Sequence, residues 1–202
     1  MDADLDQTGQ IKSRDRVRDL AEVYTHDREV DAMLALIPDM FREIDIRFLE
    51  PACGHGNFLV AILARKLLLI TEEQHGGTPH WYEFATLRAV ASIYAVDISE
   101  ENVVEARERM RAVVDKEFAD QGYEPTPRFH DALAAILSAN LVGGDTLRDA
   151  QSIRFLEWTA GDDETFVRTP SYLEDPAFDL FFAPPEPLPP VHYSELTSET
   201  SL

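Results

Sequence analysis

Apolar residues along this chain follow two patterns, the 3.6-residue period of helices and the short runs of buried strands. Helices are predicted over residues 57–70, 81–91, 99–118 and 129–139, and over 13–41 with a break at 24–26. Strands are predicted over residues 44–50, 92–98, 140–142, 152–158 and 178–182. Residues 71–79 are expected to form an exposed loop, and 165–172 a weakly structured return. Because helices separate the strands, we expect an α/β fold with a parallel sheet that binds ligands at the carboxyl ends of its strands.

The length of 202 residues suits one domain with terminal extensions. We expect an N-terminal helical segment over residues 1–43 and the α/β domain over 44–183. Residues 184–202 form a Pro-rich tail with few apolar side chains. Such a segment cannot build a core of its own, so we expect the tail to be extended or disordered.

Composition points to a cytoplasmic globular protein. The apolar fraction of 45% is ordinary, and no apolar run reaches the roughly 18 residues of a membrane span. The acidic N-terminus lacks the basic start of a signal peptide. Cys53 is the single cysteine, which excludes an intramolecular disulfide and a cysteine-based metal site, and we expect no metal.

The charge of the chain argues against tight DNA binding by this polypeptide alone. It has 18 Lys and Arg residues against 38 Asp and Glu residues, a formal net charge of −20. Proteins that grip DNA neutralise its phosphates with basic side chains. The basic residues at 12, 14, 16 and 18 form either a local basic patch or the solvated face of a helix start.

The most informative segment is Phe48–Phe58, with the sequence Phe-Leu-Glu-Pro-Ala-Cys-Gly-His-Gly-Asn-Phe. An apolar pair, a turn with two glycines and an apolar helical run predict strand, tight turn and helix. Gly54 and Gly56 allow a ligand to approach the main chain, although an ordinary strand-to-helix turn also uses such glycines. The carboxylate of Glu50 would repel a pyrophosphate and suits a ligand with an amino group. S-adenosylmethionine therefore fits this turn better than NAD does.

Residues 51–58 closely resemble the glycine-rich motif of the N6-adenine DNA methyltransferases of restriction–modification systems, which has the form D/E-P-A-C-G-x-G-x-F. The resemblance implies a Rossmann-like class I methyltransferase sheet, parallel, with helices on both faces. The sheet would be incomplete at the C-terminus, because the chain ends soon after residue 186. The resemblance also implies that the turn curls around the methionine end of S-adenosylmethionine. The turn residues expected to contact the cofactor are Glu50, Pro51, Ala52, Gly54, Gly56, Asn57 and Phe58.

Three further segments are expected at the same edge of the sheet. Asp97, followed by Ile98, ends the second strand and is suited to accept bonds from both ribose hydroxyls, or else to cap the next helix. It lies more than 40 residues after Gly54, compared with about 20 in a simple dinucleotide fold. The resembling family includes members with an inserted helix here.

By the same resemblance, the run Gly144, Asp145, Thr146 would contact the cofactor's adenine, and Tyr24 and Thr25 its methionine end. Without the resemblance, Gly-Asp is a common turn and Tyr24 a packing residue.

The family's catalytic motif, N/D-P-P-Y/F, is degenerate here. The equivalent residues are Ala183, Pro184, Pro185 and Glu186. Ala183 lacks the side-chain acceptor that polarises the target amine, and Glu186 lacks the ring that stacks on a base flipped out of the duplex. We therefore expect weak or no catalysis by the chain alone, and DNA as a partner only if another domain or subunit completes it.

Three functions remain open from the sequence. The first is the S-adenosylmethionine-binding part of a DNA adenine-N6 methyltransferase, completed by a partner polypeptide. The second is a non-catalytic S-adenosylmethionine-binding module. The third is a methyltransferase for an amine or amide of a protein or small molecule. The glycine motif favours the first of these, and the acidic charge favours the other two.

Overall fold

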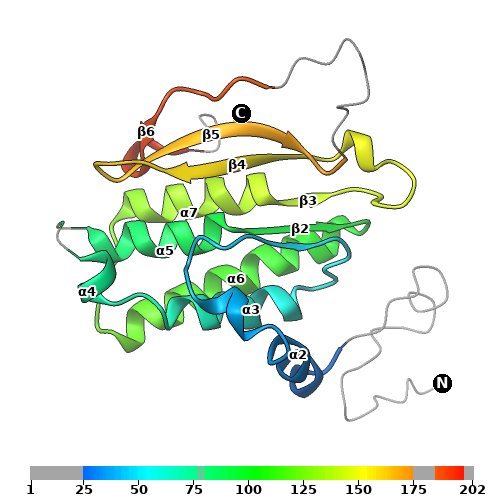
Figure 1. The fold of residues 1–202 in the computed structure, drawn as a ribbon, viewed down its shortest axis with the longest axis horizontal. Helices are drawn as coiled ribbons and strands as arrows, with labels where there is room; N and C mark the ends of the chain where they lie inside the picture. The colour runs from blue at the N-terminus through cyan, green and yellow to red at the C-terminus, as the bar shows by residue number, and fades with distance from the viewer. Residues whose placement is uncertain (1–24, 77, 79, 175–184, 198–202) are drawn as a thin grey trace, which may run out of the picture.

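The computed structural model describes residues 25–76, 78, 80–174 and 185–197 and contains two three-stranded sheets (Figure 1). The first is parallel, with the order β1-β2-β3, and the second is antiparallel, with the order β4-β5-β6. The strands of the parallel sheet are β1 (Phe48–Glu50), β2 (Ile93–Asp97) and β3 (Leu141–Gly143). Those of the antiparallel sheet are β4 (Arg154–Ala160), β5 (Thr165–Tyr172) and β6 (Val191–His192). The expected α/β class with a parallel sheet is confirmed.

Two pairs of helices pack around the parallel sheet. Helix α3 packs against α6, and α5 packs against α7, while α5 and α7 also contact β4. The α-helices are α2 (Asp27–Leu34), α3 (Asn57–Leu67), α4 (Glu72–His75), α5 (Trp81–Ala91), α6 (Glu100–Asp120) and α7 (Pro127–Asn140). The 3-10 helices are η1 (Pro38–Phe41), η2 (Ala150–Ser152) and η3 (Tyr193–Glu195). Within the described ranges, no helix has the length and apolarity needed to cross a membrane.

The core is centred on β2, all five residues of which are buried. A parallel strand covered on both faces is apolar along its whole length, and β2 has this character from Ile93 to Val96. Helix α5 is likewise buried over nine of its eleven residues. It carries apolar side chains around most of its circumference because it lies between the parallel sheet and the antiparallel one.

A buried asparagine joins the two sheets. The Nδ2 of Asn140, at the end of α7, donates to the carbonyls of Ala91 and Ile93, at 3.0 and 3.1 Å. Its Oδ1 accepts a 2.8 Å bond from Nε1 of Trp158 on β4. Asn140 is fully buried, so each of these bonds satisfies a group that has no access to water.

The described part of the C-terminal segment, residues 185–197, packs on the rest of the chain, whereas the sequence predicted an extended or disordered tail. Val191 and His192 pair with β5. Tyr193 is buried, and its hydroxyl donates a 2.7 Å bond to Oε2 of Glu83. Glu83, itself buried, also accepts bonds from the backbone N–H and the hydroxyl of Thr126. A buried carboxylate therefore holds the tail against α5 and the start of α7.

Three secondary-structure predictions were wrong in part. The loop over 71–79 contains the short helix α4, and residues 165–172 form a full strand, β5, paired along β4. The first strand covers only Phe48–Glu50 of the predicted residues 44–50. The carbonyls of Ile44 and Ile46 accept bonds from Nζ of Lys66, at 2.7 and 2.6 Å, and that of Ile44 accepts another from Oγ of Ser92. The strand predicted over 178–182 lies outside the described residues.

Lys66 supplies a test of this fold. Burial lowers the pKa of its ammonium from 10.5 to about 8, against an opposing effect of Asp45. Between these two values the unfolded chain binds more protons than the folded one, so the contribution of Lys66 to stability rises with pH. Relative to Lys66→Met, we expect the free energy of unfolding of the unmodified chain to rise by about 2 kcal/mol from about pH 7.5 to 9.5. Urea unfolding followed by circular dichroism measures this difference.

Lys116→Met is the matched control, because the side chain of Lys116 is 74% exposed. Its pH curve should run parallel to that of the unmodified chain over the same range. Parallel curves for Lys66→Met as well would contradict the burial of a charged lysine beneath β1.

Candidate functional site

The carboxyl edge of the parallel sheet brings together the segments that the sequence singled out. The register pairs Glu50 of β1 with Ala95 of β2, and Asp97 of β2 with Gly143 of β3. Glu50, Asp97 and Gly143 are the last residues of their strands. The glycine turn after β1, Asp97, and Gly144 with Asp145 after β3 therefore meet at one edge.

The two glycines of the turn have different structural roles. Gly54 has φ +52°, and a Cβ atom built on it would meet nothing within 4 Å, so its backbone borders open space. Gly56 has φ +89° and stands at the N-cap of α3. A Cβ atom there would lie 3.0 Å from Cβ of Ala106 on α6. Gly54 thus leaves room beside the turn, whereas Gly56 permits the close approach of α3 to α6.

Asp97 ties the turn to the other strand ends. Its Oδ2 accepts a 2.7 Å bond from the N–H of Gly54. Its Oδ1 accepts bonds from the N–H of Ser99 at 2.9 Å and from Nδ2 of Asn102 at 3.1 Å. The carbonyl of Asp97 accepts a 3.0 Å bond from the N–H of Gly144. Since a carboxylate has about four acceptor positions, these contacts leave about one for a ligand, not the two expected for both ribose hydroxyls.

The structure therefore supports in part the alternative that Asp97 caps the helix that follows it. Ser99 occupies the N-cap position of α6, as expected, but its side chain makes no capping bond. The carboxylate of Asp97 accepts the Ser99 N–H instead. The same side chain thus serves the start of α6 and the glycine turn.

Asp145 follows β3 with one carboxylate oxygen committed to the chain. Its Oδ1 accepts bonds from the N–H groups of Leu147 and Arg148, both at 3.0 Å. Its Oδ2 lies 4.0 Å from Nε of Arg148, whose side chain is 88% exposed. Because so exposed an ion pair is weak, Oδ2 can accept a bond from a ligand at little cost.

The electrostatic environment of the turn is negative. Desolvation raises the pKa of the half-buried Glu50 carboxyl, and the backbone N–H of Ala52, 3.4 Å from Oε1, opposes the shift. Burial, with the charges of Asp97 and Glu50, raises the pKa of the Cys53 thiol to about 12. The thiol stays protonated at neutral pH and is no nucleophile. A cationic group beside Glu50 would relieve the cost of burying its charge.

The segment before α2 reaches the same turn. Nδ2 of Asn57, the first residue of α3, donates a 2.7 Å bond to the carbonyl of Thr25. Thr25 therefore lies beside the start of α3, while Tyr24 falls outside the described residues. The other predicted contact residues differ in burial: Pro51, Ala52 and Ile98 are exposed, and Phe58 and Thr146 are partly buried.

Helix α6 supplies two contacts that the motifs did not predict. Asn102 donates to Asp97, and Arg109 donates from Nη1 to the carbonyl of His55 at 2.9 Å and contacts its imidazole ring. Asn102, Ala106 and Arg109 are four and three residues apart, so they share one helical face. That face lies against the glycine turn, since Ala106 packs on Gly56. Helical spacing measured from Asn102 could have identified Arg109.

Two of the four degenerate-motif residues, Ala183 and Pro184, lie outside the described part of the chain. Of the other two, Pro185 is partly buried and Glu186 is exposed. In the ranges that the structure covers, no three His, Cys, Asp or Glu side chains are grouped so that they could hold a metal ion.

Comparison with protein-family models, curated proteins and solved structures found no match to this chain. A functional assignment therefore depends on the chemistry of the carboxyl edge.

Proposed function

We propose that this chain binds S-adenosylmethionine at the carboxyl edge of its parallel sheet, through a Rossmann-like, class I methyltransferase arrangement. The observation that carries the proposal is the convergence of a half-buried carboxylate, an open glycine turn and a second available carboxylate on one edge. These groups match the three chemical parts of the cofactor, which are an amino acid end, a ribose and an adenine.

The amino acid end fits the glycine turn. The carboxylate of Glu50 would receive the ammonium group, and the cofactor would run along the open side of Gly54. The first bond within α3 is that from Val60 N–H to the Gly56 carbonyl, so the earlier N–H groups of the helix are suited to bind the methionine carboxylate. The pyrophosphate of NAD would instead face Glu50, which disfavours a dinucleotide.

The nucleoside end fits the ends of β2 and β3. Asp97 would accept one ribose hydroxyl at its remaining acceptor position, and Oδ2 of Asp145 would accept a bond from the exocyclic amine of adenine. Ile98, whose side chain is 59% exposed, offers an apolar face to the adenine ring. Asn102 and Arg109 would act as positioning residues, since they hold Asp97 and the turn rather than the cofactor.

Within this proposal, the chain is the cofactor-binding part of a DNA adenine-N6 methyltransferase and is weak or inactive alone. The glycine motif supports the DNA enzyme, with DNA bound only after another domain or a partner polypeptide completes the site. The net charge of −20 and the degenerate residues Ala183 and Glu186 support the second candidate, a non-catalytic S-adenosylmethionine-binding module. As part of the same proposal, the protein is located in the cytoplasm.

The pH dependence of cofactor affinity tests the role of Glu50. An ionised carboxylate attracts the ammonium of S-adenosylmethionine, and a protonated one does not. Because burial raises the pKa of Glu50 above 4.5, affinity should fall as pH falls toward that raised value. Glu50→Gln should cost about 2 kcal/mol at neutral pH and remove this part of the pH dependence. Calorimetric titration at several pH values measures both effects.

Asp120→Asn, at the far end of α6, serves as the control and should bind like the unmodified chain. Equal affinity and equal pH dependence in Glu50→Gln would show that the ammonium does not lie at Glu50. Tight binding of NAD without binding of S-adenosylmethionine would refute the proposed cofactor.

Methyl transfer tests the catalytic part of the proposal. We expect little or no transfer of tritiated methyl groups to unmethylated DNA by the unmodified chain, because loss of a positioned polar group typically lowers the rate by about two to three orders of magnitude. Ala183→Asn combined with Glu186→Tyr restores the residue types of the family motif. Activity only in this double variant would indicate a decayed site, whereas efficient turnover by the unmodified chain would contradict the proposal.

A further inference from the structure

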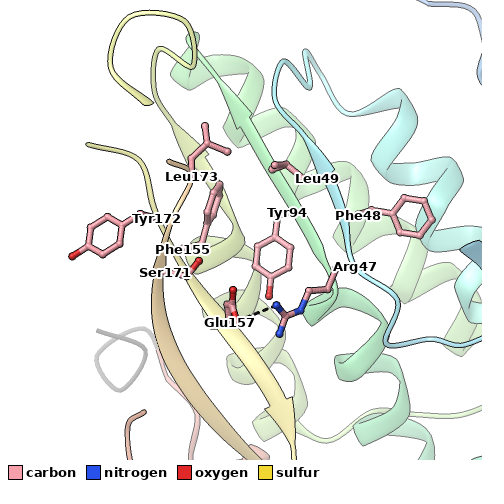
Figure 2. A pocket seen from close by; sticks show the side chains of 9 residues that line it. All are labelled: Arg47, Phe48, Leu49, Tyr94, Phe155, Glu157, Ser171, Tyr172 and Leu173. Carbon is pink, nitrogen blue, oxygen red and sulfur yellow. Dashed lines mark ion pairs between the residues drawn. The ribbon is translucent and has the colours of Figure 1, made fainter. Parts of the chain in front are cut away.

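A cavity lies between strands of the two sheets. It is an open pocket with a volume of about 200 Å³, lined by Arg47 and residues of β1 and β2 on one side and by β4 and the end of β5 on the other (Figure 2). None of the residues that line it belongs to the glycine turn or to the Asp97 and Asp145 segments. Its volume is below the roughly 300–1,000 Å³ of sites for drug-sized ligands, so it suits a single small ring system.

The inner wall of the cavity is aromatic and apolar. Tyr94 of β2 and Phe155 of β4 are both 7% exposed, and their rings meet edge to face with centroids 5.6 Å apart. Leu49 and Leu173 flank these rings (Figure 2). Leu49 is 49% exposed although it lies in the middle of a strand of the parallel sheet. Aromatic and leucine side chains of this kind favour a flat apolar ligand.

The other wall is polar but has no net charge. Nη1 of Arg47 lies 3.0 Å from Oε2 of Glu157, and the two side chains are 50% and 40% exposed. This contact uses one of the five N–H donors of the guanidinium and one carboxylate oxygen. The pair therefore presents hydrogen-bond donors and acceptors side by side, while neither charge stands alone. Tyr94 adds a hydroxyl that already bonds the backbone of Trp158 and, since burial raises its pKa to about 12, stays protonated.

This combination selects against ions. An anionic ligand would meet Glu157 and the field of a chain with net charge −20, and a cationic one would have to compete with Arg47, 3.0 Å from Glu157, for the carboxylate. A neutral, planar heterocycle with a donor and an acceptor on neighbouring atoms meets neither difficulty. Its edge matches the guanidinium and carboxylate, and its face can lie on the ring of Phe155, to which the ring of Tyr94 stands at 77°.

We propose that this cavity binds the ring of a neutral nitrogen heterocycle of purine size, as a free base or nucleoside without phosphate. Phe155 provides the stacking surface, Tyr94 borders it, and Arg47 with Glu157 recognises the donor–acceptor edge. The proposal goes beyond cofactor binding and does not depend on it, because the two sites share no residue.

The test uses 2-aminopurine, whose fluorescence falls on stacking, as the probe in titrations of the full chain. We expect a dissociation constant of about 1 mM or below. Phe155→Leu, which keeps an apolar side chain without the ring, should weaken binding about tenfold. Phe118→Leu removes a buried ring at the far end of α6 and is the matched control for effects on folding. It should leave the affinity unchanged.

Two further variants keep the test decisive if Phe155→Leu folds poorly. Leu49→Trp places a large side chain at a half-exposed position of the wall and should abolish binding. Asp145→Ala removes a proposed cofactor contact and should leave 2-aminopurine binding intact, as should an excess of S-adenosylhomocysteine. Loss of binding in Asp145→Ala with full binding in Leu49→Trp would place the ring at the cofactor edge and overturn the proposal. Absence of any fluorescence change up to about 10 mM probe would overturn it as well.

Discussion

The carboxylate of Asp97 is the interaction on which the functional edge depends. Asp97 is 8% exposed, so its charge must be balanced by hydrogen bonds from within the chain. Those bonds come from Gly54, Ser99 and Asn102, which belong to the turn after β1 and to the start of α6. The backbone of Asp97 adds the bond to Gly144 after β3. One residue at the end of the central strand thus fixes the relative positions of all three strand ends. The same commitment restricts what Asp97 can offer a ligand, because most of its acceptor positions are already in use.

The surroundings of Asp97 explain why a cationic ligand suits this edge. Glu50 and Asp97 both raise the pKa of Cys53, which lies between them in the chain, and Glu50 is itself partly desolvated. A site with two nearby carboxylates binds an ammonium or sulfonium group more readily than a pyrophosphate. The negative net charge of the whole chain, in contrast, repels nucleic acid. Cofactor binding and DNA binding therefore place different demands on this polypeptide, and the second requires a basic surface from elsewhere.

Local patterns predicted much of the fold and little of its long-range bonding. The helix Trp81–Ala91 was predicted with its observed bounds, because apolar residues and a following strand define both ends. The meeting of Gly54 with Asp97 followed from the rule that parallel strands share their carboxyl edge. Strand β5 was missed although Thr165, Phe166 and Val167 favour strands, because the sequence does not show its pairing with β4. The order of the C-terminal segment was missed for a similar reason, since the Tyr193 bond to Glu83 spans 110 residues. Lys66 bonds to the carbonyls of Ile44 and Ile46, before the observed start of β1, and no local pattern reveals these contacts.

The central claim is that S-adenosylmethionine binds at the edge organised by Asp97, and mapping of amide chemical shifts by NMR tests it most directly. Addition of S-adenosylhomocysteine to the ¹⁵N-labelled chain should change the amide chemical shifts of Gly54, Ile98 and Asp145 most strongly. In Asp97→Asn these shift changes should be smaller and less confined to the three strand ends. Amides of β4 and β5 near Phe155 should be nearly unaffected. Saturating ligand that shifts no amide at the three strand ends, or shifts only amides of the antiparallel sheet, would contradict the account.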